Sequence, residues 1–117
     1  MKNKETISKN YLENIPHKLC ISYDVDKDGI VTLEVENKGF ANKIAQKLLK
    51  KPKISYIHLD EFGSFVWNKI DGQKTIQDIG EDVRENFGDK ANPLYERLAK
   101  YFQILSSYGF VDFNKHI

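Results

Sequence analysis

The chain has 117 residues, of which 40% are hydrophobic, 12% aromatic and 30% charged, and its formal net charge is +1. This length predicts one domain spanning residues 1–117, with a hydrophobic core of its own. The balanced charge gives no global argument for nucleic-acid binding. No apolar run is long enough to span a membrane, and the first ten residues, MKNKETISKN, lack the apolar stretch of a signal peptide. We therefore expect a cytoplasmic protein that does not enter a membrane.

Residues 1–18 are predicted to form an N-terminal arm, in which residues 11–16 are either a short helical turn or extended chain. Residues 19–36 follow as a β-hairpin, because Val31, Leu33 and Val35 alternate with polar side chains. The tetrapeptide Asp-Lys-Asp-Gly at residues 26–29 forms its turn.

The stretch DVDKDGIVTLEVE at residues 24–36 also matches the first half of an EF-hand calcium loop. Its twelfth position should carry a bidentate carboxylate, but Val35 stands there. The flanking segments have the alternation of strands, whereas an EF-hand requires helices. We therefore favour the hairpin over a calcium site.

An amphipathic helix is predicted at residues 40–50, where Phe40, Ile44 and Leu48 share one face. Residues 37–59 contain six lysines and no acid, so this segment carries +6 and the remainder −5. Three interpretations stay open: a solvated helix, a positive field that steers an acidic partner, or a surface for nucleic acid or anionic lipid. The candidate contacts with an acidic partner are Lys43, Lys47, Lys50, Lys51 and Lys53.

A third strand is predicted at residues 54–59, and because it is apolar on both sides we expect partial cover on both faces. Three helices and a short final strand at residues 110–113 follow. The first helix begins after an N-cap at Asp60 and ends at the turn Asp71-Gly72. The second begins at a near capping box of Thr75 and Asp78 and ends at Gly88. The third has Pro93 in its first turn and stops at Gly109. This order predicts an α+β fold of winged helix-turn-helix type, with three short strands packed on three helices and an extra basic helix between strands two and three. Within it, residues 19–59 hold the strands and residues 60–113 hold the three helices.

The sequence offers little for catalysis or for a metal. A single cysteine, Cys20, excludes an internal disulfide and a thiolate zinc site, and we interpret it as a small buried hydrophobic residue. The histidines His17, His58 and His116 lack the spacing of a metalloprotease, and no phosphate loop or G-x-S-x-G motif is present. Trp67 is interpreted as a core residue. We expect no enzyme activity, no cofactor and no metal.

The stretch LDEFGSFVWNKIDGQKTIQDIG and the later YFQILSSYGFVDF resemble the PqqD family, named for a pyrroloquinoline quinone biosynthesis protein. The shared pattern is a strand ending in Leu59, an Asp-Glu helix start, an Asp-Gly turn, a Thr-Ile-x-x-Ile helix and a last helix ending in Gly-Phe-Val. The resemblance covers about residues 54–113. The segment 37–53 is longer than the tight turn that the family pattern implies between strands two and three.

The resemblance implies a non-catalytic peptide-binding module, also called a RiPP recognition element. Such a module holds the leader of a ribosomally made precursor peptide and presents it to a modifying enzyme, often a radical S-adenosylmethionine protein. The leader docks as an extra strand against the third strand and the third helix. The candidate site residues that follow are Ile54, Ser55, Tyr56, Ile57, His58, Tyr95, Leu98, Tyr101, Phe102 and Leu105.

Of the third helix, Leu98, Phe102 and Leu105 are expected to face the core, whereas Tyr95, Tyr101 and Tyr108 either rim the core or line a peptide groove. The main alternative is a winged-helix DNA-binding protein. The third helix offers only Arg97, Lys100 and Gln103 for base contacts, which argues against base readout but not against phosphate contact. An interaction subunit of another complex is a further alternative, and the chain is expected to be a monomer or a dimer.

Overall fold

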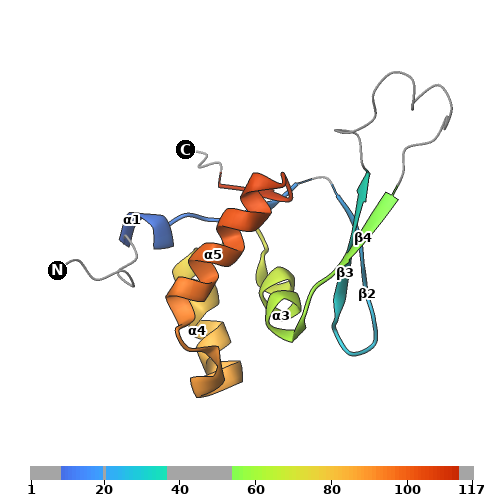
Figure 1. Ribbon diagram of the computed structural model, residues 1–117. Coiled ribbons are helices and arrows are strands. Elements are labelled where there is room, and N and C mark those ends of the chain that lie inside the picture. The colour runs from blue at the N-terminus through green and yellow to red at the C-terminus, as the bar shows by residue number, and fades with distance from the viewer. Residues whose placement is uncertain (1–8, 20, 37–53, 114–117) are drawn as a thin grey trace, which may run out of the picture.

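The computed structural model describes residues 9–19, 21–36 and 54–113 and shows an α+β fold, with a small sheet on one side of α3 and the remaining helices on the other (Figure 1). The predicted helix at residues 40–50 lies outside the described residues, together with Cys20, Lys43, Lys47, Lys50, Lys51 and Lys53. In chain order the elements are α1 (Lys9–Leu12), β1 (His17–Lys18), β2 (Ser22–Val25), β3 (Val31–Glu36), β4 (Ile54–His58), α3 (Glu61–Lys69), α4 (Ile76–Phe87), a 3-10 turn η1 (Gly88–Ala91), α5 (Leu94–Ser107) and β5 (Val111–Asp112).

Strands β2, β3 and β4 form an antiparallel sheet in that order, so the predicted hairpin and third strand are confirmed. The carboxylate of Asp26 builds the hairpin turn, because its Oδ1 accepts hydrogen bonds from the backbone N–H groups of Asp28 at 2.8 Å and Ile30 at 3.0 Å. Gly29 adopts a φ of +85°, a conformation that glycine reaches without strain. Of the three aspartates that resemble a calcium loop, Asp26 and Asp28 therefore belong to a turn and Asp24 to strand β2.

Ser64 joins the sheet to α3. Its buried hydroxyl accepts a hydrogen bond from the backbone N–H of Val31 at 2.9 Å and donates one to the carbonyl of Leu59 at 3.3 Å. The side chains of Val31 and Leu33 are fully buried against the helices. The inner face of the sheet is therefore the face on which α3 packs.

The helices begin and end close to the predicted residues. The side chain of Asp60 accepts from the N–H of Gly63 at 2.7 Å, which caps α3. Thr75 and Asp78 form a complete capping box at the start of α4. Pro93 stands at the N-cap of α5, one position before the first turn in which it was predicted.

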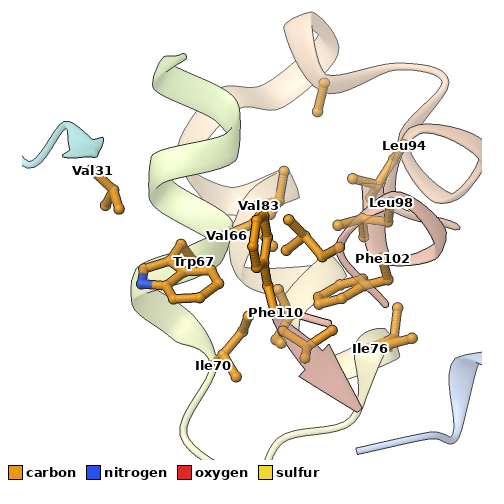
Figure 2. Close-up of a cluster of buried hydrophobic side chains, with 14 of the residues drawn as sticks. Val31, Val66, Trp67, Ile70, Ile76, Val83, Leu94, Leu98, Phe102 and Phe110 are labelled. Carbon is orange, nitrogen blue, oxygen red and sulfur yellow. The ribbon is translucent and has the colours of Figure 1, made fainter. Parts of the chain in front are cut away.

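The core lies where α3, α4 and α5 meet and includes a tryptophan, as predicted (Figure 2). Trp67 is fully buried, and its ring lies edge-on to Tyr23 of β2 at a centroid distance of 5.3 Å. The other fully buried large side chains include Leu33, Ile76, Ile79, Val83, Leu98 and Phe102.

Residues 9–18 of the predicted arm pack against the rest of the chain. Leu12 of α1 belongs to the core, and the carbonyl of Asn14 accepts from the N–H of Ile76 at 2.9 Å. Strand β1 pairs with β5 in a second, two-stranded sheet. The final strand was predicted from the sequence, but its partner was not.

Candidate functional site

One edge of strand β4 is open in the part of the chain that the structure describes. Within the residues that the structure describes, β4 pairs with β3 alone. The N–H of Leu59 donates to the carbonyl of Val31 at 2.9 Å, which fixes the hydrogen-bonding phase of the strand. Alternate residues of an antiparallel strand direct their backbone groups to the same side, so Ser55 and Ile57 face β3. The backbone groups that face the open edge belong to Ile54, Tyr56 and His58.

The two faces of β4 differ in character. Ser55 and Ile57 share the inner face with their β3 partners, whereas Ile54, Tyr56 and His58 lie on the outer face. The exposed fractions are 44% for Ile54 and 58% for Tyr56. Helix α3 packs on the inner face, and no described element packs on the outer one, so cover of the outer face by another part of the chain stays a prediction.

Three predicted site residues of α5 lie in the core. The exposed fractions of Leu98, Phe102 and Leu105 are 0%, 0% and 4%. They face the core, as the sequence analysis expected. Their side chains therefore offer no surface to a peptide, and they act on the site by holding α5 in place.

The two candidate tyrosines of α5 are partly buried and have different neighbours. The hydroxyl of Tyr101 donates to the carbonyl of Gly63 at 2.7 Å, which ties α5 to the first turn of α3. Burial, with the negative charge of Asp60 adding to it, raises the pKa of Tyr101 well above its ordinary value. Tyr95 lies beside Gly80 of α4, with the guanidinium of Arg84 5.6 Å from its ring centroid. Of the two, Tyr101 is therefore the one near the end of β4.

Ile104 of α5 was not predicted for the site, and Tyr108, the C-cap residue of α5, was expected at the core rim or in a groove but was not among the candidate site residues. Residues at spacings of three, four and seven share one face of a helix, so both lie on the face that carries Arg97 and Tyr101. That face is directed toward the start of α3, because the guanidinium of Arg97 lies 4.0 Å from the ring centroid of Phe62. Ile104 is 48% exposed and Tyr108 is 67% exposed. The spacing was visible in the sequence, but a helix that is apolar on several faces does not reveal which face meets α3.

A family model described as coenzyme PQQ synthesis protein D (PqqD) matches residues 39–111, more than half of the chain. The chain belongs to the PqqD family. The resemblance in the sequence is thereby confirmed, and the match contains β4 and the helices α3, α4 and α5. The match begins after β2 and β3, so two of the three strands of this chain's larger sheet lie outside the matched residues. A comparison with curated proteins found no match, and a comparison with solved structures found none either.

Two further observations concern this PqqD-family chain. In the described ranges, no group of three or more His, Cys, Asp or Glu side chains is placed to hold a metal ion. None of the helices in those ranges has the length and apolar character needed to cross a membrane.

Proposed function

We propose that this PqqD-family protein is a non-catalytic accessory of peptide maturation. It binds the leader of a ribosomally made precursor peptide by strand addition to β4 and presents it to a modifying enzyme such as a radical S-adenosylmethionine protein. The observation that carries the proposal is the open edge of β4, where Ile54, Tyr56 and His58 direct their backbone groups outward. The family description, coenzyme PQQ synthesis protein D, supports a place in the synthesis of that coenzyme or of a related product.

The physical basis is the pairing of main-chain groups. An exposed strand edge presents unpaired N–H and C=O groups, and an extended peptide satisfies them while its side chains enter sites on either face. Three exposed apolar side chains support the proposal: Ile57 on the inner face of β4, at 37% exposed, Ile104 of α5 and the C-cap residue Tyr108. Ser55 and the partly buried Tyr101 complete this part of the proposed site, with Leu98, Phe102 and Leu105 behind them.

The proposal retains three predictions from the sequence. Helices α3 to α5 with the β-hairpin form a winged helix-turn-helix. The lysines at positions 43, 47, 50, 51 and 53 contact acidic parts of the leader or of the enzyme. The protein acts in the cytoplasm, where a ribosomally made precursor is first available.

Replacement of Tyr56 by proline tests the strand addition. Proline removes the N–H that faces the open edge and leaves the β3–β4 hydrogen bonds intact, because the N–H of Tyr56 does not face β3. The probe is a short peptide that the tagged full chain captures from its native host, identified by mass spectrometry and resynthesised with a fluorescent label. We expect the affinity, measured by fluorescence anisotropy, to fall at least about tenfold, the order expected when backbone pairing is interrupted.

The matched control is Tyr56→Thr, which keeps the N–H and the strand propensity and should lose less affinity than Tyr56→Pro. Circular dichroism and urea unfolding establish that both variants are folded. An unchanged affinity in folded Tyr56→Pro would contradict strand addition at β4. Recovery of DNA in place of a peptide, with binding that weakens as salt rises, would favour the winged-helix DNA-binding alternative.

A further inference from the structure

On the outer face of the sheet, side chains of the three strands line up in rows across the strands. The register places Ser22, Glu34 and Tyr56 in one row and Asp24, Thr32 and His58 in the next. Tyr56 is the most exposed of the large apolar side chains on this face, at 58%. In the described residues of these rows the only formal charges are the carboxylates of Asp24 and Glu34. A strand added to β4 would extend both rows by one residue.

We propose that the bound leader places a lysine or arginine beside Tyr56 on this outer face. The inference rests on the proposed strand addition, and it specifies the chemistry of one position of the ligand. Directly opposed side chains on neighbouring strands lie about 5 Å apart, so a basic side chain opposite Tyr56 can cover its ring. Glu34 stands one strand further, about 10 Å from the backbone of the added strand, within the combined reach of a lysine and a glutamate.

Two interactions favour the basic side chain, and one disfavours an acidic one. A cation over a tyrosine ring is attracted by the negative face of the ring. The carboxylate of Glu34, with that of Asp24 in the next row on β2, attracts the same cation. A glutamate or aspartate at that position would meet like charge across the row. The aliphatic stem of lysine or arginine also covers apolar surface of Ile54 and Tyr56.

The chain already contains this type of pairing on the inner face of the same hairpin. The ammonium of Lys18 lies 4.9 Å from the ring centroid of Tyr23 and 5.0 Å from that of Trp67, and it donates a hydrogen bond to the Tyr23 hydroxyl at 3.3 Å. A tyrosine on a strand of this sheet therefore accommodates a lysine from a neighbouring segment. Tyr56 has the exposure to accept one from a bound strand.

The test is a selection of random twelve-residue peptides, displayed on phage, against the immobilised full chain. Peptides that bind the β4 edge are recognised by loss of binding to Tyr56→Pro. Among them we expect enrichment of lysine or arginine at one position within an alternating pattern. One selected peptide is then resynthesised with Lys, Gln or Glu at that position, and its affinities for the wild-type protein are measured at low and high salt.

We expect the Lys peptide to bind about tenfold more tightly than the Glu peptide at low salt, with the Gln peptide between them, as a cation–π contact and an exposed ion pair together would give. The variant Glu34→Gln should reduce the discrimination to about threefold, and Tyr56→Thr should reduce it further. High salt should weaken the contribution of Glu34. The control Glu85→Gln removes an exposed carboxylate from α4 and should leave the discrimination unchanged.

The outcomes separate this inference from the proposed function. Edge-bound peptides with no preference for a basic residue, or with equal affinity for the Lys and Glu forms, overturn the inference and leave strand addition in place. A selection that yields no peptide sensitive to Tyr56→Pro overturns both. A preference that persists unchanged in Glu34→Gln and Tyr56→Thr also overturns the inference, because its origin then lies elsewhere.

Discussion

The hydroxyl of Tyr101 links α5 to α3 by donating to the carbonyl of Gly63 at 2.7 Å. Because burial raises its pKa in the folded chain, ionisation of this phenol is disfavoured by the fold. A raised folded-state pKa contributes stability that is complete below the unfolded-state value of about 10 and declines as the pH rises above it. The alkaline limb of the stability curve should therefore depend on this residue.

Tyr101→Phe should lower the free energy of unfolding by about 1 kcal/mol at neutral pH, because one buried hydrogen bond is lost. Above pH 10 the variant should lose stability less steeply than the wild type. Urea unfolding followed by circular dichroism, at neutral pH and in steps through the alkaline range, measures both effects. The control is Tyr108→Phe on the 67% exposed side chain. Parallel pH curves for wild type and Tyr101→Phe would refute the assignment.

At the scale of elements, the packing of α4 on α5 depends on a glycine. A Cβ atom at Gly80 would lie 2.5 Å from Cε1 of Tyr95 and 3.1 Å from Cδ1 of Leu98. Alanine in an exposed helix interior normally stabilises by about 1 kcal/mol relative to glycine. Here the overlap with a ring between two helices outweighs that gain.

We therefore expect Gly80→Ala to lower the free energy of unfolding by about 1–3 kcal/mol. Urea denaturation measures the change. The double variant Gly80→Ala/Tyr95→Leu is the control, because a shorter side chain leaves room for the methyl group. It should be less destabilised than the sum of the two single changes predicts. A stabilised Gly80→Ala would show that α4 and α5 can separate without cost.

The element boundaries show which features the sequence could predict. The caps at Asp60 and Thr75 and the turn at Asp26 are local signals, in which a side chain bonds a backbone N–H two to four residues away. These were predicted, together with the three strands of the larger sheet. Strand β5 was predicted, but its pairing with β1 was not, because β1 has two residues and alternation cannot be detected over that length.

The sequence could predict the strand of the candidate site but not which side chains of α5 lie at its surface. The strand at residues 54–58 follows from its pattern and from the family resemblance. On α5 the sequence could not assign side chains to the surface, because Tyr95, Tyr101 and Tyr108 are chemically alike. Tyr95 and Tyr101 are partly buried by contacts with Gly80 and Gly63, which are distant in the sequence, whereas Tyr108 stays exposed.

At the scale of the whole molecule, the residues matched by the PqqD model are not the same as the residues that build the core. The match starts at residue 39, whereas the fully buried Val31 and Leu33 and the buried Leu12 precede it. Residues 39–111 alone would lack the partner of β4 and the ring of Tyr23 against Trp67. The core is therefore completed by described residues that precede the match, among them Leu12, Val31 and Leu33.

A fragment of residues 39–111 should consequently fail to unfold cooperatively in urea, whereas a fragment of residues 9–113 should unfold in a single transition. Far-ultraviolet circular dichroism during urea titration distinguishes the two cases. The longer fragment is the matched control, because it contains every helix and strand described. Cooperative unfolding of the shorter fragment would mean that β2 and β3 are dispensable for the core.

Alternate backbone amides of β4 face opposite sides of the strand, so their hydrogen exchange can report whether a ligand strand is bound at the edge. Among the described residues, the amide hydrogens of Ile54, Tyr56 and His58 face the open edge of β4, whereas those of Ser55, Ile57 and Leu59 face β3. Deuterium should therefore replace the amide hydrogens of β4 quickly at every second position and slowly at those between. A ligand that adds a strand should slow the fast set and leave the slow set as it was. Nuclear magnetic resonance can then detect occupancy residue by residue, even when the ligand has not been identified.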